Sequence, residues 1–153
     1  MNVLGVDRVI LATPDLTETR DRWRDLLGIT FGAVLEPTTS TDSGGQDVAN
    51  VISDTGIELV TPRDEGGEVS RFLAEHGPGL YAVSIRVADL DEATSHLAER
   101  GLEPVGEYHA NDFSEVFYHP RAFGGAMVIL AAYDAPHPAE TASRRTGVET
   151  GSP

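Results

Sequence analysis

Three stretches with the character of β-strands include polar side chains that could do chemistry. Arg8 lies within 6–13, Asn50 within 47–53 and Glu58 within 56–61. A guanidinium is a permanent cation with several N–H donors, whereas a carboxylate can accept hydrogen bonds or a proton. Asn50 is equally consistent with a polar residue at the edge of a strand. These three residues are the first candidates for a site.

The residue types behind several common catalytic sites are missing. The sequence has no cysteine, which excludes disulfides, thiolate metal sites and a cysteine nucleophile. It has no Ser-His-Asp arrangement, phosphate-binding glycine loop or nucleotide fingerprint. His119, before Pro120, could help to form the mouth of a cleft, although a lone histidine at a turn often caps it. Tyr81 and Tyr118 could supply ring walls and hydroxyls, or they could be half-buried core tyrosines.

An internal repeat supplies the elements that must position these residues. The stretch 9–18, VILATPDLTE, reappears 74 residues later as 83–92, VSIRVADLDE. In each copy an apolar run precedes Asp-Leu, and a Glu follows three residues after the Asp, which predicts a strand and a capped helix. Two copies of one small unit must pack together to bury their apolar faces. We expect the site in the cleft between them.

Both units follow the order βαβββ. The first is predicted from a strand at 6–13, a helix opened by Asp15 and Glu18 and ended by Gly28, and strands at 29–35, 47–53 and 56–61. The second is predicted from a strand at 80–87, a helix at 89–100, and strands at 102–107, 115–119 and 126–132. This pattern indicates an α+β fold in which tandem modules form one curved mixed sheet.

The domain organisation follows from the same pattern. We expect one domain over residues 1–133, with modules at about 4–64 and 79–133 and a linking helix at about 68–76. Residues 134–153 are polar and acidic with almost no large apolar group, which predicts a flexible tail.

The charge balance limits the partners. The formal net charge is −14, from 25 acidic and 11 basic residues. Such a field repels nucleic acid and anionic membranes, although a solvated surface alone would have the same composition. No apolar run approaches the ~18 residues of a membrane span. We expect a cytoplasmic protein that binds neither nucleic acid nor membrane.

The tandem layout resembles the vicinal-oxygen-chelate superfamily, which includes glyoxalase I, bleomycin-resistance proteins and methylmalonyl-CoA epimerase. The local similarity is greatest to the epimerase branch, in 56–62 (GIELVTP), in 72–80 (FLAEHGPGL), and in His119-Pro120 followed by Gly124-Gly125. The resemblance covers roughly residues 5–133. It implies a glyoxalase-like fold, a small-molecule ligand or substrate in the cleft, and a homodimer.

Members of this superfamily typically bind a divalent metal through four strands. The positions that correspond here are Arg8, Glu58, Ala82 and Ile129. Only Glu58 can ligate a metal, and one carboxylate cannot hold a hard divalent ion. We therefore predict no metal and no other cofactor.

Arg8 could take the place of the metal. The resemblance places Arg8 and Glu58 at positions that face the cleft in this superfamily, and it therefore implies that they meet on the cleft floor. Residues two apart in each strand would share that face. The guanidinium could then hold a ligand carbonyl and stabilise an enolate, with Glu58 orienting it. A structural ion pair left after loss of the metal is the alternative. Asp42 lies near the catalytic carboxylate of the epimerases and is a candidate base.

The favoured function is a metal-independent isomerase, epimerase or cyclase acting on a carbonyl-bearing small molecule. The candidate catalytic residues are Arg8, Glu58 and Asp42, and the candidate ligand-binding residues are Asn50, Tyr81, Ser84, Tyr118 and His119. The alternatives are a non-catalytic drug- or metabolite-binding protein of the bleomycin-resistance type and a relic without a ligand. Convergence of Arg8, Glu58 and Asn50 with a carboxylate of raised pKa favours the enzyme. An aromatic groove at a dimer seam favours the binding protein, and a cleft filled by its own side chains favours the relic.

Overall fold

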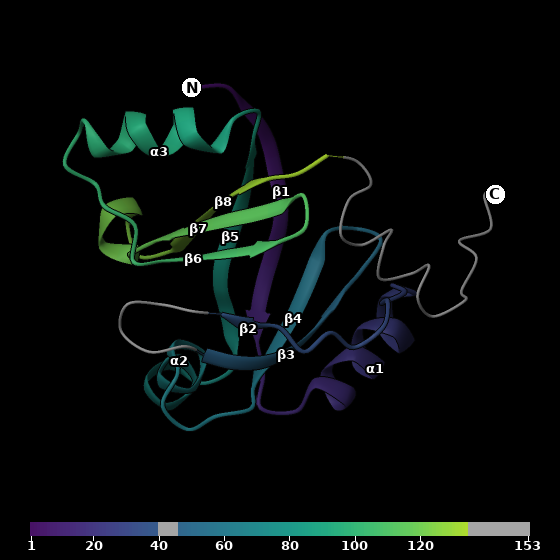
Figure 1. The fold of residues 1–153 in the computed structure, drawn as a ribbon. Helices are drawn as coiled ribbons and strands as arrows, with labels where there is room; N and C mark the ends of the chain where they lie inside the picture. Colours follow the sequence, from purple (N-terminus) through teal and green to yellow (C-terminus); the bar gives the residue numbers. More distant parts are fainter. Residues whose placement is uncertain (40–45, 135–153) are drawn as a thin grey trace.

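The computed structural model describes residues 1–39 and 46–134, which form an α+β fold built on one curved sheet of eight strands (Figure 1). The predicted fold class is confirmed. The elements are β1 (Val3–Ala12), α1 (Leu16–Leu27), β2 (Thr38–Thr39), β3 (Gln46–Ile52), β4 (Ile57–Pro62), α2 (Glu68–His76), β5 (Gly79–Val87), α3 (Leu90–Ala98), β6 (Gly106–Ala110), β7 (Phe113–Tyr118), the short 3₁₀ helix η1 (Pro120–Phe123) and β8 (Met127–Ala132).

The order of the strands reproduces the repeat. The sheet runs β2-β3-β4-β1-β5-β8-β7-β6, so each half places its first strand at the centre. The central strands β1 and β5 are antiparallel, and each pairs in parallel with the last strand of its own module, β4 or β8. Val9 and Val83, which begin the two copies of the repeat, are paired with each other. The two modules therefore meet edge to edge around the middle of the repeated strand.

The two repeated helices begin as the sequence predicts. Asp15 accepts a hydrogen bond from the backbone N–H of Glu18 at 2.9 Å, and Asp89 does the same for Glu92 at 2.8 Å. Each carboxylate satisfies a donor of the first turn that has no partner within the helix. Gly28 ends α1 in the left-handed conformation, with φ of 70°. The second helix stops at Ala98, two residues before the predicted end.

Some predicted strands have different bounds. The segment 29–35 is not a strand, because it forms only isolated bridges, from Leu35 to Asn50 of β3 and from Phe31 to Ser53, which directly follows β3. In the second module, β6 and β7 form a hairpin whose turn consists of Asn111 and Asp112. Asn111 has φ of 58°, a conformation that asparagine tolerates in tight turns.

The helices divide the apolar residues into separate clusters. Trp23 and Leu16 of α1 pack with Val51 and Leu59 on the outer face of the first module. The corresponding cluster of the second module lies beneath α3. The inner face of the sheet carries a third cluster, to which α2 contributes Val69. This inner face forms the cleft. Across the described residues, none of the helices combines the length and apolarity of a membrane span.

Residue 134 lies beyond the last strand, and the rest of the expected tail, 135–153, is outside the described residues.

Candidate functional site

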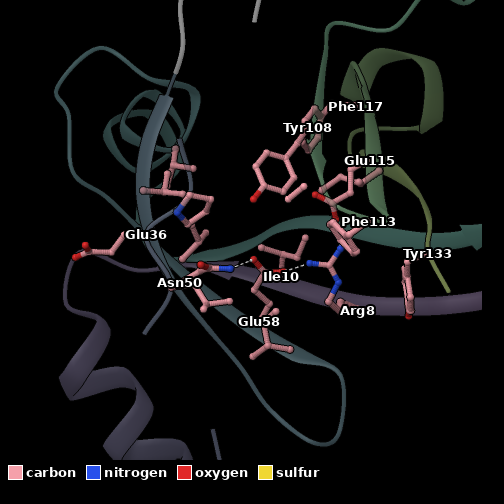
Figure 2. A pocket seen from close by; sticks show the side chains of 18 of the residues that line it. Arg8, Ile10, Glu36, Asn50, Glu58, Tyr108, Phe113, Glu115, Phe117 and Tyr133 are labelled. Carbon is pink, nitrogen blue, oxygen red and sulfur yellow. Dashed lines mark hydrogen bonds and ion pairs between the residues drawn. The ribbon is translucent and has the colours of Figure 1, made fainter. Parts of the chain in front are cut away.

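A cavity of about 430 Å³ opens on the inner face of the sheet, lined by side chains of both modules and of α2. Figure 2 shows its polar floor, where Arg8, Asn50, Glu58 and Glu115 approach one another from four strands. The other walls are mostly apolar and aromatic. The cleft is therefore not filled by its own side chains, which argues against the relic.

The Arg8 side chain, only 4 % exposed, is the centre of the polar floor. Its Nε donates to Asp7 Oδ2 at 2.9 Å and its Nη1 to Glu58 Oε2 at 2.5 Å. Its Nη2 donates to Ser84 Oγ at 3.2 Å and to Glu115 Oε1. Burial alone would lower the pKa of the guanidinium, but the charges of Glu115, Glu58 and Asp7 outweigh it and raise the pKa above its usual value. Arg8 is therefore a fixed cation that joins both modules.

Strand register brings Glu58 and Asn50 to this point. Ile10 is the partner of Glu58 in the parallel pair β1–β4, and Asn50 lies on the neighbouring strand β3. The Asn50 Nδ2 donates to Glu58 Oε1 at 2.8 Å. The meeting of Arg8 and Glu58 that the superfamily resemblance implies is therefore present.

Gly56 permits the close approach of β4 to β1. It has φ of 83°, and an added Cβ would lie 3.2 Å from the backbone oxygen of Asp7. The Gly56 carbonyl accepts a hydrogen bond from the N–H of Val9 at 2.9 Å. A glycine is favoured here by both its conformation and the space available.

Glu115 is a functional candidate that the sequence reasoning missed. It lies on β7, is 7 % exposed, and contacts Arg8 from the second module. Burial raises its pKa, with the charge of Arg8 opposing and that of Glu58 adding to the shift. The signal was present in the sequence, since Phe113, Glu115 and Phe117 alternate along one strand face. Which partner that face meets depends on the tertiary structure.

Asp7 and Tyr133 form a second layer around the guanidinium. The Tyr133 hydroxyl donates to Asp7 Oδ1, and Asp7 Oδ2 holds the Nε of Arg8. Burial, followed by the hydrogen bond to Asp7, raises the pKa of Tyr133. The pairing of β1 with β5 is irregular between Val6 and Arg8, at the position of Asp7. This local irregularity was not predictable from an alternating pattern.

The predicted ligand-binding residues differ in whether they line the cavity. Tyr81 lines the cavity and packs edge-on against Phe72, with ring centroids 5.2 Å apart. Ser84 is fully buried and accepts from Arg8, so it supports the floor from outside the cavity lining. Tyr118 is not in the cavity, because strand alternation turns it into the cluster beneath α3.

His119 also lies outside the cavity lining. Its Nδ1 accepts from the backbone N–H of Arg121 at 3.1 Å and so caps η1. Asp42 is outside the described residues, and its predicted role as a base stays a prediction.

The donor set does not fit the metal that the superfamily resemblance implies. Asp7, Glu58 and Glu115 converge, but on the N–H groups of a permanent cation that would repel a divalent ion. The side chains of Ala82 and Ile129, at two of the expected ligand positions, have no donor atoms. In the described part of the chain, no group of three or more His, Cys, Asp or Glu residues is arranged to hold a metal.

Comparison with known proteins gives consistent relatives. The chain is 29% identical over 130 residues to an ethylmalonyl-CoA/methylmalonyl-CoA epimerase from Cereibacter sphaeroides, covering 82% of this chain and 95% of that protein. It is similar to the crystal structure of methylmalonyl-CoA epimerase from Mycobacterium tuberculosis, with a TM-score of 0.71, 27% identity, and coverage of 87% and 90% of the two chains.

A structure of Streptomyces coelicolor methylmalonyl-CoA epimerase with 2-nitronate-propionyl-CoA shares the fold, with a TM-score of 0.68 at 21% identity over 88% of this chain and 100% of that one. The family model described as the glyoxalase/bleomycin resistance protein/dioxygenase superfamily matches residues 7–117. With most of both modules inside that match, the chain belongs to the glyoxalase/bleomycin resistance protein/dioxygenase superfamily.

Proposed function

We propose that this protein is an isomerase or epimerase that moves a proton at a carbon next to a carbonyl group, without a metal. One observation carries the proposal: buried carboxylates from the two modules, Glu58 and Glu115, are bonded to Nη1 and Nη2 of one guanidinium in the floor of a cavity. Stereochemical inversion at such a carbon needs a base on one face and an acid on the other. Similarity to proteins named as epimerases supports the same reaction class.

The two carboxylates take different roles because their surroundings differ. Glu58 is oriented by hydrogen bonds from Asn50 and Arg8 and acts as the base. Burial raises the pKa of Glu115, which favours its protonated form and suits it to act as the acid. In the reverse direction the roles exchange.

The proton transfer balances within this set of residues. Glu58 removes the proton, and the electron pair of the broken C–H bond moves into an enolate whose oxygen is stabilised by the Arg8 cation. Glu115 then donates its proton to the opposite face of the carbon, and the electron pair of the enolate forms the new C–H bond. Glu58 ends protonated and Glu115 ionised, and exchange with water resets both.

Solvent deuterium exchange tests the proposal. The protein is incubated in D₂O with methylmalonyl-CoA, acetoin or 3-aminobutan-2-one, each of which has a stereogenic C–H next to a carbonyl. We expect deuterium at that carbon, seen by proton NMR, together with inversion, seen by chiral analysis, for at least one compound. The absence of exchange in all three contradicts the proposal.

Variants of Glu58 and Glu115 distinguish the base from the acid. Starting from the enantiomer whose proton faces Glu58, Glu115→Gln is expected to exchange the proton with retention, because only the face served by Glu58 stays active. Glu58→Gln is expected to lose exchange of that enantiomer. Glu99→Gln, on the exposed end of α3, is the matched control and is expected to behave as the wild type.

The second candidate function is binding without catalysis. It is favoured by the use of four of the five N–H groups of Arg8 in bonds to the protein's own side chains. Saturable binding of a compound that shows no exchange would identify this function. The homodimer is likewise a proposal, and native mass spectrometry would report the number of subunits.

A further inference from the structure

The charges around the cavity differ from those that a CoA thioester with a free carboxylate would require. The described residues that line it include five carboxylates, Glu36, Glu58, Asp112, Glu115 and Asp134, and a single basic side chain, Arg8. We infer that the site takes a cationic carbonyl compound, one that carries a protonated amine and neither carboxylate nor phosphate. This inference rests on the proposed function, since it names the substrate class of the same cleft.

Arg8, the single basic side chain among the described residues that line the cavity, is already neutralised. Arg8 bonds to Asp7, Glu58 and Glu115, so three carboxylates surround one guanidinium. Even with Glu115 protonated, this cluster keeps a net negative charge. Before proton transfer, an anionic ligand group would therefore meet repulsion at the floor, whereas an ammonium group would be attracted. Once Glu58 has taken the proton of the substrate, the cluster is neutral and Arg8 can stabilise the enolate oxygen.

The mouth of the cavity is acidic as well. Asp112 lies in the tight turn between β6 and β7, and Asp134 directly follows the aromatic Tyr133 after β8; both are exposed. No described basic side chain forms a salt bridge with either. Glu36 at the mouth differs, because Arg63 lies 3.2 Å from it. Asp112 and Asp134 are thus the carboxylates best placed to attract a cation.

The aromatic walls point independently to the same class of ligand. The rings that line the cavity belong to Tyr81, Tyr108, Phe113, Phe117 and Tyr133. Figure 2 shows Tyr108, Phe113 and Phe117 on one side of the space and Glu36 and Asn50 on the other. Aromatic faces bind ammonium groups through their negative electrostatic potential, and a nearby carboxylate strengthens the attraction. Phe113 already contacts a cation, since the guanidinium carbon of Arg8 lies 5.5 Å from its ring centroid.

Asn50 adds a buried acceptor to this wall. The residue is 6 % exposed and lines the cavity, and its Oδ1 has no hydrogen-bond partner among the described residues. Its orientation is fixed by the bond from Nδ2 to Glu58, because a carboxylate requires a donor there. A buried acceptor without a partner favours a ligand that brings an N–H or O–H donor.

Binding of three probes tests the inference without any turnover. Choline is compared with 3,3-dimethylbutan-1-ol, its neutral isostere, and with propionyl-CoA, an anion, by titration calorimetry at low ionic strength. We expect choline to bind roughly tenfold tighter than the isostere, and propionyl-CoA to bind more weakly than choline. Added NaCl should weaken the binding of choline and leave the isostere unaffected. Equal binding of choline and the isostere, tighter binding of propionyl-CoA, or no binding of choline would overturn the inference.

Variants test whether the carboxylates at the mouth of the cavity cause the preference for choline. The double variant Asp112→Asn/Asp134→Asn is expected to weaken choline binding roughly fivefold and to leave the isostere unchanged. Asp91→Asn, in the first turn of α3, removes a charge elsewhere and serves as the control. Loss of choline binding in the control to the same extent would assign the preference to net charge alone and overturn the inference.

The outcomes distinguish this inference from the proposed function. Deuterium exchange into acetoin without a preference for choline overturns the inference and leaves the proposed reaction standing. A preference for choline without exchange in any carbonyl compound supports a cation site and contradicts the proposed reaction.

Discussion

The two modules share a strand and helix pattern but differ at the positions that face the cleft. In the repeat, Arg8 of β1 corresponds to Ala82 of β5, and Glu58 of β4 corresponds to Ile129 of β8. In the first module both positions are charged, and in the second both are small or apolar. The modules thus kept the residues that build the sheet, whereas the residues that build a site diverged.

The second module carries its charged residue, Glu115, not on β8 but on the neighbouring strand β7. Glu115 pairs with Ala131, two residues beyond Ile129, and Asn50 pairs with Val60, two residues beyond Glu58. Glu115 and Asn50 therefore occupy equivalent places. The first module has a neutral amide at this place and the second has a carboxylate, and this carboxylate bonds to Arg8 of the first module.

The largest effect is expected from removing the shared cation. Arg8→Met leaves Asp7, Glu58 and Glu115 buried without a counter-charge, and breaking a buried ion pair in this way costs about 3–5 kcal/mol. Urea denaturation measures the loss. Arg24→Met, an exposed arginine of α1, is the control and is expected to change stability by less than ~0.5 kcal/mol. A loss no larger than the control would mean that the cluster does not hold the modules together.

Giving both modules a carboxylate at this place should have an intermediate effect on stability. Asn50→Asp replaces the donor to Glu58 by a second carboxylate, which removes a buried hydrogen bond and adds repulsion. We expect a loss of about 2–3 kcal/mol in unfolding free energy at pH 7. The loss should shrink in acid, where one of the two carboxyl groups takes up a proton. A variant as stable as the wild type at both pH values would show that the amide is not required beside Glu58.

The smallest effect is expected at Glu115, in the dependence of stability on pH. Burial raises its folded-state pKa, so between about pH 4.5 and that raised pKa the folded protein binds more protons than the unfolded chain. The contribution of Glu115 to stability is therefore fully present below its unfolded pKa and is lost as pH rises through the folded pKa. Glu115→Gln should flatten this part of the curve of unfolding free energy against pH. If the slope of this curve is unchanged in the variant, another group takes up the proton.

The sequence predicted most of the fold because the determining signals are local. The Asp-x-x-Glu pattern after each β-branched run marked both helix starts, at Asp15 and Asp89. The superfamily resemblance, rather than a local pattern, predicted that Arg8 and Glu58 both face the cleft. The errors arose where local signals are weak, as in 29–35, where the chain follows β3 but pairs with it at only two points.

The sequence by itself determined that two similar modules form one sheet, because strand periodicity and helix caps act over a few residues. Only the tertiary structure decided that Asp7, Glu115 and Tyr133 complete the arginine site. Glu115 is 107 residues from Arg8, and Tyr133 is 126 residues from Asp7. Their contacts depend on the junction of β1 with β5, on the register of β7 against β8, and on an irregularity within β1. These features are set by packing between modules, which no local pattern contains.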